Sequence, residues 1–407
     1  PVPGTNKYYL HSFHKDQPDL NWQNPVLREE IYTMINWWLD KGIAGFRIDA
    51  IINIKKDLEW RSLPSDRKNG LVPVPESLVN AQPIEPFLQE LKERTFAKYN
   101  AFTVGEVFNE TDEELHFFIG KDGVFSSIFD FKQTMLGQEG KGWFDHSLPT
   151  ADELKESIFQ AHERADSIGI LSTIIENHDE PRGVSHYIAE GPVNDTSKKA
   201  LGTIQILRKG IPFIYQGQEI GMENQVFESV EDFDDIATIN GYHVAKEAGL
   251  SEEEALAVIA KYSRDNARTP MQWSREPGLG FSDESAWLIS PKPDVAINVE
   301  DQEKDPNSIL NYYRQLTALY RHPLYGNTIR FGDMIPAYRD RENIIAFERR
   351  GDKRLLVISN FQNREATLEL PAPIKTVVLN NTAGLFQEGE QVLELAPYQT
   401  FVLELVE

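Results

Sequence analysis

The stretch Lys41-Gly-Ile-Ala-Gly-Phe-Arg-Ile-Asp-Ala-Ile-Ile52 decides the fold, because it reads as the end of a helix followed by a buried strand over 45–51. Side chains two apart on a strand point to the same face, so we expect Arg47 and Asp49 to face one place. A neighbouring cation favours the ionised carboxylate and lowers its pKa. The stretch therefore predicts an anionic Asp49 suited to act as a nucleophile, although by itself it fits a structural ion pair equally well.

Two further apolar runs end in carboxylates. They are Ala101-Phe-Thr-Val-Gly-Glu106 and Ile170-Leu-Ser-Thr-Ile-Ile-Glu-Asn-His-Asp179. In parallel α/β barrels the C-terminal ends of the strands carry the active site. Three strands of this kind favour a catalytic site over a structural ion pair.

Strands and amphipathic helices alternate up to about residue 325, which is typical of a parallel α/β sheet. A helix is expected from Asn24 to Gly42, with Trp37 and Trp38 packed in the core rather than stacked on a ligand. A closed barrel needs eight strands. The pattern predicts five strands of a (β/α)8 TIM barrel, at 45–51, 101–105, 124–131, 170–176 and 211–216.

The pattern changes after this region. A long insertion over 219–304 is expected to hold helices near 229–237 and 251–262. From residue 326 onward, short strands with alternating apolar residues predict an antiparallel β-sandwich domain. These strands are predicted at 344–348, 355–359, 366–370, 375–379, 391–395 and 400–405.

From about Tyr8 to its end, the chain resembles glycoside hydrolase family 13, the α-amylase superfamily, and within it the oligo-1,6-glucosidase and α-glucosidase group. Each matching string is short, but five of them stand in the order found in that family. They are Gln17-Pro-Asp-Leu-Asn21, Gly45-Phe-Arg-Ile-Asp49, Gly105-Glu106-Val107, Asn177-His-Asp179 and Ser263-Arg-Asp-Asn-Ala-Arg-Thr-Pro-Met-Gln-Trp273.

The resemblance implies a domain arrangement. Residues 1–23 would be the tail of the family's inserted small domain B, 24–325 the C-terminal portion of the catalytic barrel, and 326–407 the β-sandwich domain. Only the last five barrel strands would then be present, and a missing N-terminal segment would be needed to complete the barrel. No cofactor is expected in this chain. Calcium, where family members bind it, would lie in the absent N-terminal part.

The resemblance agrees with the chemistry read from the residues. Cleavage of a glycosidic bond needs a carboxylate and a protonated acid. Asp49 would be the nucleophile, and Glu106, with its pKa raised by apolar surroundings, the general acid and then base. Asp179 with His178 would hydrogen-bond the sugar hydroxyls. A retaining mechanism predicts a separation of roughly 5–5.5 Å between the Asp49 and Glu106 carboxyl groups.

Other substrate-binding residues follow from the resemblance alone. Arg268 would grip the terminal glucose, and Arg264 would tie its loop down. Phe13 and Gln17 would lie beside the first sugar sites, where a structural role fits them nearly as well.

Linkage preference is predicted from the residue after the nucleophile. Family members that favour α-1,6 bonds usually carry valine there, whereas Ala50 resembles the α-1,4-tolerant type. Strict strand alternation would, however, turn Ala50 away from Asp49. Glu176-Asn177 also departs from the paired asparagines common in isomaltose-cleaving members. Together these residues favour α-1,4 hydrolysis with some α-1,6 activity.

Composition excludes several classes of protein. The net charge of −23 argues against nucleic acid or an anionic membrane as a partner, and it is compatible with the neutral oligosaccharide that the resemblance implies. No run of about 18 apolar residues could span a bilayer. The absence of cysteine is compatible with the cytoplasm of a bacterium. Because Pro1 is no initiator residue, the native N-terminus is expected upstream.

Other functions share the same carboxylates. They include an oligo-1,6-glucosidase or dextran glucosidase, a trehalose-6-phosphate hydrolase, and a transglycosidase such as a sucrose isomerase or trehalose synthase. The arginine-rich loop of sucrose isomerases is not found, since 131–150 contains no arginine. A non-catalytic, transporter-associated homologue would have a membrane span and could lack the carboxylates, whereas all three are present here.

Overall fold

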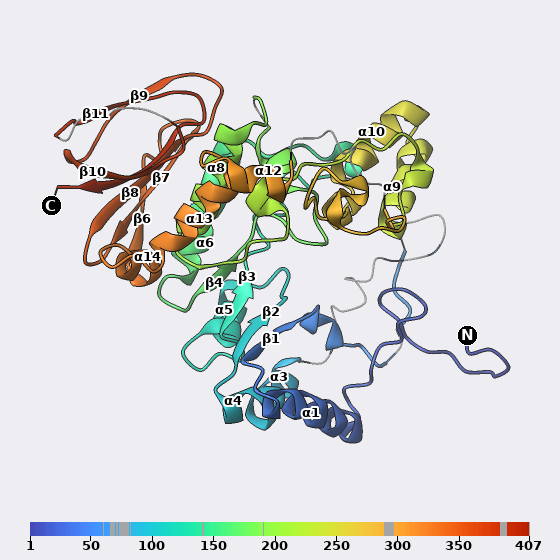
Figure 1. The fold of residues 1–407 in the computed structure, drawn as a ribbon. Helices are drawn as coiled ribbons and strands as arrows, with labels where there is room; N and C mark the ends of the chain where they lie inside the picture. Colours follow the sequence, from blue (N-terminus) through green and yellow to red (C-terminus); the bar gives the residue numbers. More distant parts are fainter. Residues whose placement is uncertain are drawn as a thin grey trace. The chain divides into compact units, whose positions relative to one another are not determined.

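The computed structural model describes residues 1–59, 61–65, 70, 72, 81, 83–140, 142–189, 191–288, 297–382 and 389–406. The chain forms two compact units. Unit 1 holds residues 1–129 and 165–170, and unit 2 holds 130–164 and 171–407. The ribbon in Figure 1 follows the chain from its N-terminus in blue to its C-terminus in red.

Unit 1 contains three parallel strands, β1 (Gly45–Ile48), β2 (Phe102–Gly105) and β3 (Ser127–Phe129). Gly45 pairs with Phe102, and Val104 pairs with Ser127. A glycine is required at position 45, because a Cβ there would lie 1.8 Å from the Phe102 carbonyl oxygen. The helices in the described residues of this unit are α1 (Pro25–Asp40), α3 (Glu85–Arg94), α4 (Phe96–Tyr99) and α5 (Asp112–Ile119), with a 3-10 turn η1 over Ile51–Ile54.

Helix α1 begins as predicted. Asn24 caps it by accepting a hydrogen bond from the Val26 amide, and proline occupies the first turn. The prediction that Trp37 and Trp38 pack in the core was wrong, because their side chains are 51% and 41% exposed in this chain. The buried stripe runs instead along Tyr32, Ile35 and Leu39. Helical periodicity predicted one apolar face of α1. The face that is buried includes Tyr32, and the two tryptophans lie outside it.

Unit 2 also contains alternating helices and parallel strands, beginning with α6 (Ala151–Ala165), β4 (Leu171–Thr173) and β5 (Ile211–Pro212). Ser172 of β4 pairs with Ile211 of β5. All five predicted parallel strands are present in the described residues, but each is shorter than predicted. The further helices of unit 2 are α7 (Gly183–Tyr187), α8 (Asp195–Leu207), α9 (Ile236–Glu247), α10 (Glu252–Tyr262), α11 (Asp265–Arg268), α12 (Val299–Lys304), α13 (Ile309–Leu319) and α14 (Gly326–Phe331).

The helix predicted at 229–237 was wrong. Only a 3-10 turn, η4 (Val230–Asp232), forms there, and the α-helix begins later, at Ile236. Asp235 caps α9 by accepting a hydrogen bond from the Thr238 amide. A side-chain acceptor at this position satisfies an amide that the helix leaves unpaired, so the helix starts after Asp235.

The C-terminal part of unit 2 is antiparallel, as predicted. Its larger sheet has the strand order β10-β12-β8-β7-β6, and a smaller sheet pairs β11 with β9. The strands are β6 (Asp333–Ala337), β7 (Ile344–Arg350), β8 (Arg354–Asn360), β9 (Ala366–Glu369), β10 (Ile374–Asn380), β11 (Val392–Leu395) and β12 (Thr400–Leu405). Strand β6 was missed because it contains Pro336, which is tolerated here at the edge of the sheet.

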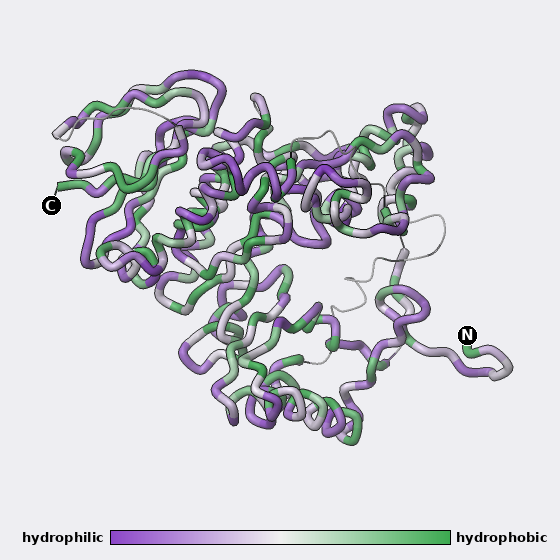
Figure 2. Tube along the Cα trace, viewed as in Figure 1, coloured by the Kyte–Doolittle hydropathy of each residue, from purple (hydrophilic) through white to green (hydrophobic). Residues whose placement is uncertain are grey.

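The larger sheet is buried on both faces. One face packs against β9 and β11, through residues such as Leu368, Leu393 and Phe401. The other face packs on α8 and α13, which lie beside the sheet in Figure 1. Strand β12 is accordingly apolar along most of its length near the C-terminus (Figure 2). This second interface joins the C-terminal sheet to the helices of unit 2.

Truncating this interface should destabilise the protein. Leu316 of α13 is fully buried in the cluster that joins α8, α13 and the sheet. We expect Leu316→Ala to lower the free energy of unfolding by about 2–5 kcal/mol, through lost burial and the cavity left behind. Urea unfolding monitored by circular dichroism measures it. Leu324→Ala is the matched control, since Leu324 is 56% exposed; equal losses for both variants would contradict this description of the core.

None of the helices in the described part of the chain has the length and apolarity that a membrane crossing requires. In the same residues, no group of three or more histidine, aspartate and glutamate side chains is arranged to hold a metal ion. The calcium prediction concerned residues outside this chain and stays a prediction.

Candidate active site

In unit 1, Arg47 links the two carboxylates predicted to do the chemistry. Its Nη1 atom pairs with Oδ1 of Asp49, and its Nη2 atom lies 2.8 Å from Oε1 of Glu106. The Asp49 side chain is 72% exposed, whereas that of Glu106 is 5% exposed. The guanidinium therefore holds one accessible and one buried carboxyl group together.

Glu106 comes directly after β2. Burial raises its pKa most, and the hydrogen bond with Asp49 and the charge of Asp49 act in the same direction. The hydrogen bond from the Ala50 amide and the charge of Arg47 lower it, but the net shift is upward. Gly105 lets the Phe125 ring approach, because a Cβ at this glycine would lie 2.5 Å from a ring carbon. A buried carboxyl group with a raised pKa is suited to act as a general acid.

Ala50 departs from the predicted strand. Strand β1 ends at Ile48, and Ala50 has a left-handed backbone with φ of 40°. Few residues with a side chain adopt this conformation. It directs the Ala50 amide toward Glu106, with a distance of 2.7 Å between the nitrogen and Oε2. The prediction that strand alternation reaches Ala50 was therefore wrong, and its backbone amide holds the Glu106 carboxyl group in place.

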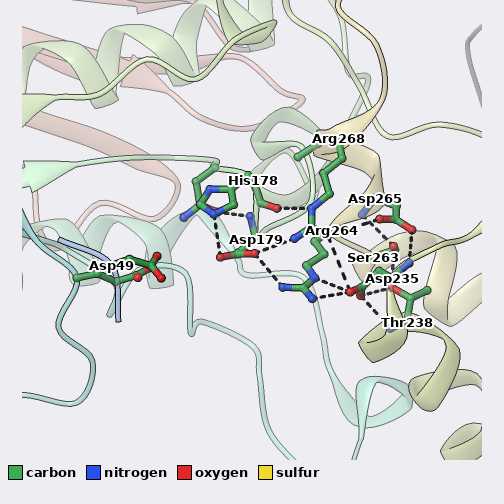
Figure 3. A network of polar contacts seen from close by, with 12 residues as sticks. Asp49, His178, Asp179, Asp235, Thr238, Ser263, Arg264, Asp265 and Arg268 are labelled. Carbon is green, nitrogen blue, oxygen red and sulfur yellow. Dashed lines mark hydrogen bonds and ion pairs between the residues drawn. The ribbon is translucent and has the colours of Figure 1, made fainter. Parts of the chain in front are cut away.

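In unit 2, one carboxylate oxygen of Asp179 accepts hydrogen bonds from two arginines. Nη1 of Arg264 and Nη2 of Arg268 each lie 2.9 Å from Asp179 Oδ1. The other oxygen, Oδ2, is 3.2 Å from Nε2 of His178. Arg268 also donates from Nε to the His178 carbonyl oxygen, at 2.8 Å. Figure 3 shows these side chains converging on Asp179.

Sequence reasoning missed a second carboxylate in this network. Asp235 Oδ1 accepts a hydrogen bond from Arg264 Nε at 2.7 Å and lies 2.6 Å from its Nη2. Its side chain is 1% exposed. Burial alone would raise the pKa of Asp235, but the hydrogen bonds from Arg264 and Thr238 and the charge of Arg264 outweigh it, so the pKa lies below its usual value. The N-cap pattern Asp-Ile-Ala-Thr at 235–238 was the signal available in the sequence.

The loop between β4 and α7 is held by a buried ion pair. Arg182 Nη1 lies 3.0 Å from Glu176 Oε1, and both side chains are 1% exposed. Arg182 also donates to the Gln216 carbonyl oxygen, and Glu176 accepts from the Gly183 amide. Glu176 is thus an internal anchor of the loop that carries His178 and Asp179.

The remaining predicted residues lie in the irregular N-terminal segment. Phe13 is 56% exposed, and Gln17 is also exposed. The backbone amide of Gln17 donates a hydrogen bond to the His14 carbonyl oxygen. Their predicted place beside the first sugar sites stays a prediction. The predicted carboxyl separation for Asp49 and Glu106 also stays a prediction.

Comparisons with known proteins match this picture. The family model for the α-amylase catalytic domain matches residues 3–324. The chain belongs to the α-amylase family of glycoside hydrolases. A second model, for the C-terminal domain of the α-amylase SusG, matches residues 344–402, which contain most of the antiparallel strands. The family and the general architecture predicted from the sequence, a TIM-barrel catalytic domain followed by an antiparallel β-domain, are confirmed.

Individual members of the family are similar over much of the chain. A probable oligo-1,6-glucosidase 3 of Bacillus subtilis is 40% identical over 77% of this chain and 56% of its own length. An oligo-1,6-glucosidase of Halalkalibacterium halodurans is 36% identical over 98% of this chain and 72% of its own. The crystal structure of an isomaltulose synthase from Protaminobacter rubrum has a TM-score of 0.90 and 30% identity, covering 99% of this chain and 72% of that protein.

Proposed function

We propose that the protein is a retaining, exo-acting α-glucosidase that releases terminal α-linked glucose from short malto- or isomalto-oligosaccharides. The observation that carries the proposal is the Arg47 bridge between an exposed Asp49 and a buried Glu106 whose pKa is raised. This pairing brings an accessible carboxyl group together with a buried one that keeps its proton to higher pH than an ordinary glutamate, and cleavage of a glycosidic bond requires a carboxylate and an acid of this kind.

The proposed reaction has two displacements. Asp49 attacks the anomeric carbon, and Glu106 donates its proton to the departing glycosidic oxygen, leaving a covalent glucosyl ester on Asp49. Glu106, now ionised, takes a proton from water, which attacks the anomeric carbon and releases glucose and Asp49. His178 and Asp179 would hydrogen-bond the glucose hydroxyls, with Arg264 and Arg268 keeping the Asp179 side chain oriented.

The stereochemistry of the product tests this mechanism. Two displacements at one carbon retain configuration, so the first glucose released from maltose should be the α-anomer. Proton NMR during the first minutes of hydrolysis distinguishes it from the β-anomer. β-Glucose as the first product would show a single displacement and would end the proposal of a covalent intermediate.

Linkage is the finer part of the proposal. The names of the relatives favour α-1,6 bonds, whereas Ala50 led to a preference for α-1,4 bonds with some α-1,6 activity. We expect Ala50→Val to raise the isomaltose-to-maltose ratio of kcat/KM roughly 10-fold, which is the effect of one or two methyl groups in a binding pocket. Both substrates are measured on one enzyme preparation, so any loss of folded protein cancels in the ratio.

Ala44→Val is the control for this change. Ala44 is exposed and lies directly before β1. An unchanged ratio in Ala50→Val, or an equal change in Ala44→Val, would show that position 50 does not select the linkage.

A transglycosidase is the alternative that shares these side chains. The structural neighbour is an isomaltulose synthase by name, but residues 131–150 contain no arginine that could form the corresponding loop. Incubation with sucrose separates the two functions. Free glucose and fructose support the hydrolase, whereas an isomeric disaccharide as the main product supports the isomerase. Trehalose 6-phosphate serves in the same assay as the substrate of the phosphate-specific alternative.

A further inference from the structure

Asp235 lies outside every motif that the sequence predicted to be functional, yet its carboxylate is built into the arginine pair at Asp179. Oδ1 of Asp235 receives both Nε and Nη2 of Arg264, at 2.7 and 2.6 Å. The remaining nitrogen of that guanidinium, Nη1, reaches Asp179 Oδ1. One planar guanidinium thus spans two carboxylates, of which only Asp179 is accessible. The orientation of Arg264 is consequently set from its buried side.

The buried side is itself fixed by a set of hydrogen bonds. Oδ2 of Asp235 accepts from the amide and the hydroxyl of Thr238, at 2.9 and 2.8 Å. The Thr238 hydroxyl lies 2.8 Å from the Ser263 hydroxyl. In turn, Oδ2 of Asp265 accepts from the amides of Asp234 and Asp235, each at 2.9 Å. Figure 3 shows this group beside Arg264. The start of α9 and the segment before α11 are therefore tied to each other through Asp235.

Charge balance gives Asp235 a second effect. Arg264 and Arg268 both donate to Asp179 Oδ1, and Nη1 of Arg268 lies 4.0 Å from Asp235 Oδ1. Nη1 of Arg268 also lies 3.9 Å from Asp265 Oδ1, so the two guanidinium groups face three carboxylates. Without the anion at position 235, the charge of Arg264 would act on Asp179 alone, and Arg264 would lose the partner that sets its direction.

We infer that Asp235 is a positioning residue, which acts through Arg264 to fix the orientation of Asp179. The inference rests on the proposed function, because Asp179 is assigned there to the glucose hydroxyls. It also gives the insertion over 219–304 a role, since this segment supplies Asp235 together with both arginines.

Asp235→Asn removes the charge with little change in volume, and asparagine caps helices as well as aspartate does. The NH2 group of the asparagine must face either Thr238 or Arg264. Both neighbours donate hydrogen bonds to this position, so one of these hydrogen bonds is lost. We expect kcat/KM for maltose to fall roughly 10- to 100-fold, which is the size of effect found for residues that orient a functional side chain through a hydrogen bond. KM and the inhibition constant of glucose should both rise. A smaller folded fraction alone would lower kcat and leave both constants unchanged.

Three further variants separate positioning from simple destabilisation. Asp235→Glu keeps the charge and should recover most of the lost activity. Asp234→Asn makes the same charge change one residue away, at an exposed side chain that accepts from Trp287, and should behave as the wild type. In an Arg264→Gln background, adding Asp235→Asn should change kcat/KM less than about 3-fold, because the two residues act as one unit. Multiplicative losses in the double variant, or no loss in Asp235→Asn, would overturn the inference.

A structural measurement keeps the inference testable apart from the proposed function. If the wild-type protein hydrolyses no α-glucoside, the proposed function fails, and crystal structures of the wild type and Asp235→Asn then decide the positioning role. We expect the 2.9 Å contact between Arg264 Nη1 and Asp179 Oδ1 to be lost or displaced in the variant. An unchanged contact would refute the role of Asp235.

Discussion

Asp49→Asn should reduce the hydrolysis of p-nitrophenyl α-glucoside on the order of 10⁴-fold or more, the scale seen when an enzyme loses a nucleophile. An amide of the same size can still pair with Arg47 through its oxygen, but it cannot form the glucosyl ester. The loss therefore falls on the chemical step rather than on folding. Release of p-nitrophenol gives the rate, and circular dichroism confirms that the variant is folded.

The role of Asp49 as nucleophile, rather than as a mere charge, is tested by chemical rescue. Asp49→Gly leaves space beside the anomeric carbon, where azide can take the place of the missing carboxylate. One displacement by azide should give β-glucosyl azide from the α-glucoside. Free glucose formed at the wild-type rate in Asp49→Asn, or the α-azide from Asp49→Gly, would show that another group attacks the sugar.

Glu106→Gln should have the second largest effect, and its size should depend on the leaving group. General acid catalysis contributes roughly 10²- to 10⁴-fold when the departing oxygen needs a proton. We expect a loss of this size in kcat/KM for maltose. The loss for p-nitrophenyl α-glucoside should be far smaller, because p-nitrophenolate departs without protonation. Equal losses with both substrates would contradict the assignment of Glu106 as the acid.

The pH profile tests the same residue in a different way. Burial raises the pKa of Glu106 above that of an ordinary glutamate. The acid form then persists to higher pH, and kcat/KM for maltose should decline only as the pH rises through this raised pKa. The alkaline limb should disappear in Glu106→Gln, because glutamine does not titrate in this range. Lys7→Gln, a change at an exposed residue of unit 1, is the control that should keep the limb.

Much of the candidate site could be proposed from the sequence, because its residues stand in local patterns. Asp49, Glu106 and Asp179 each stand just after an apolar run, and short sequence strings surround them. The contact of Arg47 with Asp49 was expected from a spacing of two residues, and its further contact with Glu106 required the pairing of β1 with β2. Ala50 carries no comparable signal. Its left-handed backbone forms where β1 gives way to the 3-10 turn η1, and a sequence with alanine at this position predicts an ordinary strand residue.

By itself, the sequence determined the family, the alternation of parallel strands and helices and the antiparallel C-terminal strands, and it singled out the carboxylates of the candidate site, since these depend on residue types and short spacings. The tertiary structure alone decided that the side of α1 with Tyr32 is buried while Trp37 and Trp38 are exposed, and that the buried Asp235 pairs with Arg264. The physical reason is that burial and hydrogen bonding join residues far apart in the chain. Asp179 and Asp235 are more than fifty residues apart in the chain, yet both accept hydrogen bonds from Arg264. No local sequence pattern predicts this contact.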